Sequence, residues 1–135
     1  MREKPINVLL VEDSPTDALL LREALSGEES VQFRTAHVER LAEALKSLQE
    51  QQFDLILLDL GLPDSQGLDT FSRVHDHAPQ VPIVVLTGLD DDTLAVKAVQ
   101  EGAQDFLTKG RFDRYWLVRN IRHALERHQM YLEVH

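Results

Sequence analysis

The chain has 135 residues, no cysteine and a formal net charge of −9 at pH 7, from 14 basic and 23 acidic side chains. The length suits one domain with its own hydrophobic core, the missing cysteines exclude disulfides and thiolate chemistry, and the acidic balance argues against binding to nucleic acid or an anionic membrane. No apolar run approaches the roughly 20 residues that span a bilayer, and the N-terminus lacks the pattern of a signal peptide, so we expect a soluble cytoplasmic domain.

Five short apolar runs alternate with five segments of helical spacing. The runs lie at 6–11, 31–36, 53–58, 81–86 and 105–108. Between them, apolar residues recur three or four positions apart, as on the buried face of a helix. These stripes are Ala18, Leu21 and Leu25; Leu41, Ala44, Leu45 and Leu48; Leu68, Phe71 and Val74; and Leu94, Ala95, Ala98 and Val99. A fifth helix is predicted from near Phe112 towards the C-terminus.

Local signals mark several helix ends. Ser14 is a predicted N-cap, with Pro15 at the first helical position and Asp17 in the first turn. Gly27 and Gly102 follow the first and fourth stripes, where glycine commonly ends a helix. The first helix therefore has a predicted start and end, and the fourth has a predicted end.

The alternation of strands and helices predicts an α/β fold. Right-handed βαβ units build a parallel five-stranded sheet that is covered by helices on both faces. The strand at 31–36 is more polar than the others and the strand at 105–108 is short, so both are predicted at the edges. The predicted strand order is 2-1-3-4-5, which places a ligand site at the carboxyl ends of strands 1 and 3.

Polar residues follow the predicted strands at this edge of the sheet. They are Glu12 and Asp13 after the first strand, Asp59 after the third, Thr87 after the fourth and Lys109 after the fifth. Each has an ordinary explanation by itself, because acids favour helix N-termini and Asp is common in turns. Together they predict a site with three carboxylates, a hydroxyl and an ammonium group.

Three carboxylates at one site require a counter-charge. Two unit charges about 4 Å apart repel by roughly 4 kcal/mol at an effective dielectric near 20. A hard divalent cation such as Mg²⁺, which prefers carboxylate oxygens and water, would offset this repulsion. The ammonium group of Lys109 is the side-chain counter-charge for these carboxylates. Asp59 could be a metal ligand or a nucleophile.

At these residues the chain resembles the receiver domain of two-component response regulators, from about Ile6 to about Leu125. The matching pieces are LLVEDSPTDALLL, LILLDLGLPDSQGLD, PIVVLTG and AQDFLTKG, in the expected order and spacing. The resemblance implies a (βα)5 flavodoxin-like three-layer sandwich. It also implies a signalling switch that catalyses only its own phosphorylation and dephosphorylation.

The resemblance assigns the acidic residues their roles. Asp59 would accept a phosphoryl group from the phosphohistidine of a sensor histidine kinase or phosphotransfer protein, or from a small phosphodonor. Glu12 and Asp13 would hold Mg²⁺ or Mn²⁺, together with Asp59 and the backbone carbonyl of Gly61. The physical chemistry agrees, because phosphoryl transfer depends on positioning and charge neutralisation.

The remaining roles concern switching. The resemblance implies that Thr87 hydrogen-bonds a phosphoryl oxygen, that Lys109 pairs with Asp59 or the phosphoryl group, and that Phe106 changes rotamer with Thr87. Phe106 is equally explained as a core aromatic, and it lacks the hydroxyl of a tyrosine. The family usually has a cis proline after the lysine, whereas this chain has Gly110, so we predict a trans bond or a rearranged loop there.

Several alternatives remain open from the sequence. A phosphorylation-independent interaction module would be expected to lack Asp59, Lys109 or part of the acidic pair. An Asp-nucleophile phosphohydrolase would want an acid at position 61, which is glycine. A nucleotide binder of flavodoxin type would need a hydroxyl-rich or glycine-rich loop after the first strand. The preferred hypothesis is a receiver that signals through the face made by helix 4, strand 5 and helix 5.

The C-terminal segment carries a heptad-like pattern, at Val118, Ile121, Leu125, His128 and Leu132. We therefore divide the chain into a receiver domain, 1–126, and an extension of helix 5, 127–135. The extension is interpreted as a linker to an output domain absent from this chain or as a dimer contact, and a homodimer through the helix 4–strand 5–helix 5 face is the other option. The six histidines are interpreted as surface or packing residues.

Overall fold

The computed structural model describes residues 5–27, 32–88, 92–109 and 114–134. Five parallel strands form the central sheet, in the order β2-β1-β3-β6-β7. Their bounds are β1 Ile6–Val11, β2 Phe33–Val38, β3 Leu55–Asp59, β6 Ile83–Thr87 and β7 Asp105–Thr108. This order confirms the predicted 2-1-3-4-5 topology.

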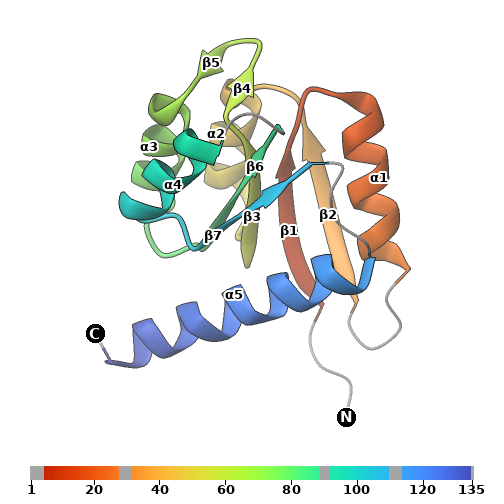
Figure 1. Cartoon of the computed structure of the whole chain (residues 1–135), viewed down its shortest axis with the longest axis vertical. Coiled ribbons are helices and arrows are strands. Elements are labelled where there is room, and N and C mark those ends of the chain that lie inside the picture. Colours follow the sequence, from red (N-terminus) through yellow and green to blue (C-terminus); the bar gives the residue numbers. More distant parts are fainter. Residues whose placement is uncertain (1–4, 28–31, 89–91, 110–113, 135) are drawn as a thin grey trace.

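Five helices cover the two faces of the sheet, so the domain has three layers (Figure 1). Their bounds are α1 Pro15–Ser26, α2 Leu41–Glu50, α3 Leu68–His77, α4 Asp92–Gln100 and α5 Arg114–Val134. Helices α1 and α5 pack on one face, and α2, α3 and α4 pack on the other. A two-stranded antiparallel hairpin, β4 Gly61–Leu62 and β5 Ser65–Gln66, follows β3.

Alternation along the strands divides the core into two clusters. In β1, Leu9 and Val11 belong to the cluster beneath α2, α3 and α4, whereas Val8 and Leu10 belong to the one beneath α1 and α5. All four side chains have 0% exposure. Burial on both faces explains why the inner strands are continuous apolar runs rather than alternating ones.

Some local predictions need correction. β2 begins at Phe33, two residues after the predicted start, and the hairpin β4–β5 was not predicted. Val99 was assigned to the buried stripe of the fourth helix but is 38% exposed, whereas Ala95 and Ala98 are buried and Leu94 packs against the core. The start predicted near Phe112 falls outside the described residues, and α5 is described from Arg114.

Helix α5 continues past the sheet without a break at residue 126 (Figure 1). Arg127 pairs with Asp105 of β7 at 3.2 Å, and the ring of His128 hydrogen-bonds the carbonyl of Gln80. The first turn of the extension is therefore held against the domain. Among the described helices, none is both long and apolar enough to cross a membrane.

Candidate functional site

The carboxyl ends of β1, β3, β6 and β7 surround an open cleft of about 590 Å³. Its lining includes Asp13, Asp59, Gly61, Thr87 and Lys109, which come from four separate segments of the chain. The parallel sheet brings them together because all its strands end at the same edge. The structure therefore gathers at one place the polar residues that the sequence placed after the strands.

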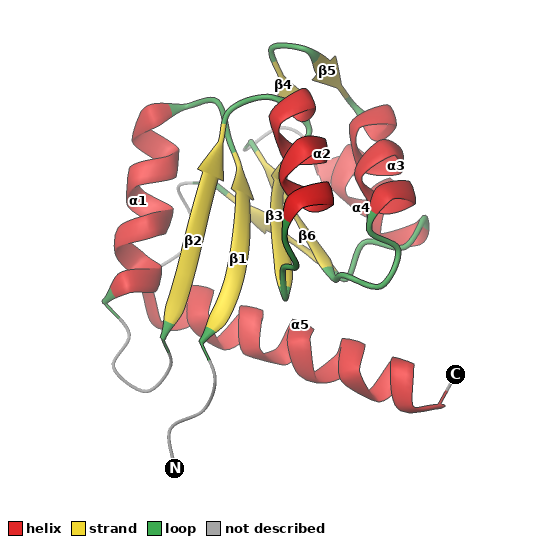
Figure 2. Ribbon diagram, turned by 180° about the vertical axis from the view of Figure 1, so that it is seen from behind, coloured by secondary structure: helices red, strands yellow, loops and turns green. Residues whose placement is uncertain are grey.

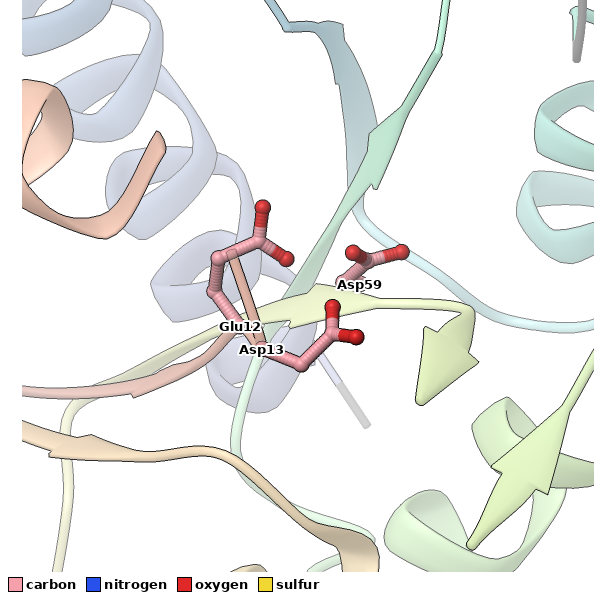
Figure 3. Close-up of side chains that lie close together, drawn as sticks. All are labelled: Glu12, Asp13 and Asp59. Atoms are coloured by element: carbon pink, nitrogen blue, oxygen red, sulfur yellow. The ribbon is translucent and has the colours of Figure 1, made fainter. Parts of the chain in front are cut away.

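Three carboxylates form the acidic part of the cleft. One oxygen from each of Glu12, Asp13 and Asp59 lies within 4.8 Å of the others, and the close-up shows the three side chains converging (Figure 3). Glu12 is completely buried and Asp59 is 8% exposed. Glu12 Oε2 is buried without a hydrogen-bond partner among the described residues. A hard cation satisfies such an oxygen, so the donor set fits a metal ion.

Lys109 supplies the positive charge of the site. Its Nζ lies 2.7 Å from Glu12 Oε1, 3.0 Å from Asp59 Oδ2 and 3.3 Å from Asp17 Oδ2. The backbone N–H of Lys109 donates to the carbonyl of Thr87 at 2.8 Å, which fixes the chain as it leaves β7. One ammonium group thus forms ion pairs with three carboxylates. The third of them, Asp17, was predicted only as a first-turn helix residue.

Burial and mutual repulsion alter the ionisation of this cluster. Desolvation, followed by the neighbouring Asp59, raises the pKa of Glu12 to about 9, against the opposing effect of Lys109. Desolvation alone would lower the pKa of Lys109, but its hydrogen bonds to Glu12 and Asp59 raise it above its usual range. Lys109 therefore stays charged at neutral pH, while Glu12 tends to hold a proton when no cation is bound.

Asp59 is held on both carboxylate oxygens. Oδ1 accepts the backbone N–H of Gly61 at 2.9 Å, and Oδ2 accepts from Lys109. A Cβ at position 61 would meet Oδ1 at 3.8 Å, an ordinary contact, so lack of space does not explain the glycine. The carboxylate is thus oriented by its own loop and by the lysine.

The other predicted site residues lie around this cluster. Thr87 is 3% exposed, and its hydroxyl donates a long, 3.5 Å hydrogen bond to the carbonyl of Leu107. Phe106 is partly buried and packs against the core cluster beneath α2, α3 and α4. Gly110 lies outside the described residues, so the prediction for the Lys109–Gly110 bond stays a prediction.

His37 is a neighbour of the site that the sequence did not single out. Its Nε2 lies 2.8 Å from the backbone carbonyl of Glu12, and the N–H of Glu12 donates to Val38 at 3.0 Å. The end of β2 thus holds both backbone polar groups of Glu12. A contact to a backbone carbonyl leaves no pattern in the sequence, and only the place of His37 at a strand end could have suggested it.

The structure is a three-layer α/β domain, with a cleft at the strand ends in which a lysine contacts several carboxylates. Comparison of the chain with known protein families identifies the class to which this domain belongs. A family model, Response regulator receiver domain, matches residues 8–129. The KDP operon transcriptional regulatory protein KdpE of Escherichia coli is 37% identical over 122 residues, which cover 90% of this chain and 52% of KdpE. The chain belongs to the response regulator receiver domain family.

Solved structures show the same fold. The signal receiver domain of an HD domain-containing protein from Pseudomonas fluorescens has a TM-score of 0.80 at 26% identity, covering 98% of this chain and 96% of that one. NtrX from Brucella abortus gives 0.83 at 28% identity, covering 97% of this chain and 29% of NtrX. The chain spans only 15% to 54% of the curated relatives it matches.

Proposed function

We propose that Asp59 is the phosphoacceptor of a two-component phosphorelay. The observation that carries this proposal is the geometry of its carboxylate, which is oriented by Gly61 and Lys109 at the floor of an open cleft. A carboxylate oxygen of Asp59 forms the new P–O bond as the P–N bond of a donor phosphohistidine breaks, and the freed imidazole keeps the electron pair and takes up a proton. The donor is a sensor histidine kinase or a phosphotransfer protein.

The residues around Asp59 have distinct roles in this proposal. Lys109, already 3.0 Å from Asp59 Oδ2, neutralises charge on the transferred group. Thr87 exchanges its weak hydrogen bond to Leu107 for one to a phosphoryl oxygen, and Phe106 follows by repacking. The change reaches the face formed by α4, β7 and α5, because phosphorylation favours one conformer of the domain over another.

Glu12, Asp13, Asp59 and the carbonyl of Gly61 would hold Mg²⁺, or Mn²⁺ in its place. The buried Glu12 Oε2, which has no hydrogen-bond partner among the described residues, and the all-oxygen donor set support this choice. When bound, the cation supplies charge neutralisation for the incoming phosphoryl group. Asp13 lines the cleft, so an ion that enters the cleft can replace the water around its carboxylate.

In this proposal the chain is a cytoplasmic signalling switch that acts on no separate substrate. The second candidate is an interaction module that works without phosphorylation. Helix α1 exposes two apolar side chains, Leu19 at 55% and Leu20 at 51%. Exposed leucines of this kind favour contact with a partner protein under both candidate functions. What separates the two candidates is whether Asp59 is modified.

Mass spectrometry of the intact protein tests the proposal. After incubation with Mg²⁺ and a small phosphodonor, we expect one phosphoryl group on the wild type and none on Asp59→Asn, because the amide is a much poorer nucleophile than the carboxylate. Asp54→Asn, at the opposite end of β3, is the control and should be modified like the wild type. An unmodified wild type, or an equally modified Asp59→Asn, would contradict the assignment.

We further propose that residues 1–126 form the receiver and that 127–135 contribute to a dimer contact or linker. Helix α4 exposes Val96 and Val99, at 47% and 38%, and helix α5 exposes Trp116, at 55%. Analytical ultracentrifugation of chains 1–135 and 1–126 at the same concentration is expected to give a larger mass per particle for the longer chain. Equal association of the two chains would count against a contact through the extension.

A further inference from the structure

The tip of the β4–β5 hairpin is attached to a different element, helix α2. Asp64 lies in the two-residue turn of this hairpin, and its carboxylate accepts backbone N–H groups from the first turn of α2. Oδ1 accepts from Leu41 at 2.8 Å and Oδ2 from Ala42 at 3.0 Å. Figure 2 shows the hairpin at the end of the sheet where α2 begins.

In the part of the chain that the structure describes, the first N–H groups of helix α2 receive no capping bond from the residue at its N-cap position. The residue at its N-cap position is Arg40, whose extended backbone is suitable for a cap but whose side chain makes no capping bond. Helix α1, in contrast, is capped locally by Ser14, whose side chain accepts the N–H of Asp17. Desolvation would raise the pKa of Asp64, but the N–H groups of Leu41 and Ala42 lower it overall.

The same hairpin carries part of the phosphorylation site. Gly61, which would present its carbonyl to the cation, pairs with Gln66 in the hairpin and donates its N–H to Asp59. The base of the hairpin is closed by the N–H of Gly67, which donates to Leu60 at 2.7 Å. Each strand has only two residues, so the hairpin is too short to be stable alone. Buried Leu62 and a 2.7 Å hydrogen bond between the hydroxyls of Ser65 and Thr70 also hold the hairpin. Attachment of its tip to α2 adds a further restraint on the position of Gly61.

We propose that Asp64 is a positioning residue for the Asp59 site, which fixes the hairpin and the Gly61 carbonyl by capping α2. This inference rests on the proposed function, because the effect is on Mg²⁺ binding and phosphorylation. Coupling between two sites is reciprocal, so Mg²⁺ binding also stabilises the first turn of α2. That consequence is measurable without any phosphoryl transfer.

Two variants separate positioning from simple stabilisation. Asp64→Ala removes both the cap and the attachment, whereas Asp64→Ala/Arg40→Ser returns a local cap to α2 without the attachment and keeps the net charge of the wild type. We expect the urea midpoint to fall in the single variant and to recover in the double variant. We expect Mg²⁺ affinity by calorimetry to fall about tenfold in both, as is typical when a supporting contact of a metal site is lost.

Asp54→Ala is the matched control. Asp54 Oδ2 also accepts a backbone N–H, from Asn7 at 2.8 Å, but at the amino end of the sheet. Its removal changes the net charge as Asp64→Ala does and should leave Mg²⁺ affinity unchanged. In the wild type, hydrogen exchange at the Leu41 and Ala42 amides should slow when Mg²⁺ is added, and in Asp64→Ala it should not.

The outcomes distinguish the two proposals. A wild type that binds no Mg²⁺ and accepts no phosphoryl group overturns the proposed function. A functional wild type whose Mg²⁺ affinity is unchanged by Asp64→Ala overturns the positioning role. Full recovery of Mg²⁺ affinity in the double variant also overturns it, because a cap alone would then suffice.

Discussion

Lys109→Met is expected to lower the free energy of unfolding of the metal-free protein by about 3 kcal/mol at neutral pH. The substitution removes the ammonium group that lies within 3.3 Å of three carboxylates, one of them completely buried. Methionine fills a similar volume, so the effect is electrostatic rather than a cavity. Because Glu12 already holds a proton at neutral pH, the charge left without its partner is mainly that of Asp59, which limits the loss. Urea unfolding in the presence of a chelator measures it.

The same variant should bind Mg²⁺ more tightly than the wild type, because the lysine and the cation compete for the same oxygens. Saturating Mg²⁺ should therefore restore part of the lost stability. Lys46→Met is the control, since Lys46 and Glu50 form a solvent-exposed pair 3.9 Å apart. It should change stability by less than about 0.5 kcal/mol. Equal losses in the two variants would show that Lys109 has no special role in the folded state.

The sheet could be predicted from the sequence because burial on both faces leaves a strong signal. The runs at 6–11 and 105–108 coincide with β1 and β7. The positions of Asp59, Thr87 and Lys109 followed from one further fact, that parallel strands end at the same edge. Both steps use periodicity and chain direction, which a single sequence contains.

Contacts between elements could not be predicted in the same way. Asp17 has the position of an ordinary first-turn acid, and its role beside Lys109 depends on how α1 lies against the strand ends. Asp64 is indistinguishable in sequence from a turn residue, yet it caps a helix 23 positions earlier. These interactions depend on packing distances between elements, for which local propensity carries no information.

Glu12→Gln is expected to raise the free energy of unfolding of the metal-free protein by about 2–3 kcal/mol at pH 7. In the wild type, Glu12 has a pKa of about 9 against an ordinary value of 4.5, because its carboxylate is buried beside Asp59. The folded state must therefore hold a proton that the unfolded chain releases. Glutamine keeps the shape and an acceptor for Lys109 without this cost, but it weakens Mg²⁺ binding by removing a charged ligand.

The pH dependence distinguishes this explanation from a general gain in packing. Because the pKa of Glu12 is higher in the folded state, its contribution to wild-type stability is most favourable below about pH 4.5 and is lost as the pH rises towards 9. The advantage of Glu12→Gln should therefore grow between pH 5 and pH 8.5 in urea unfolding with a chelator, whereas Glu101→Gln, at an exposed position, should show no such trend. A constant difference across this range would contradict the explanation. Added Mg²⁺ should reverse the order of stability, because the carboxylate that destabilises the metal-free protein is the one proposed to hold the cation.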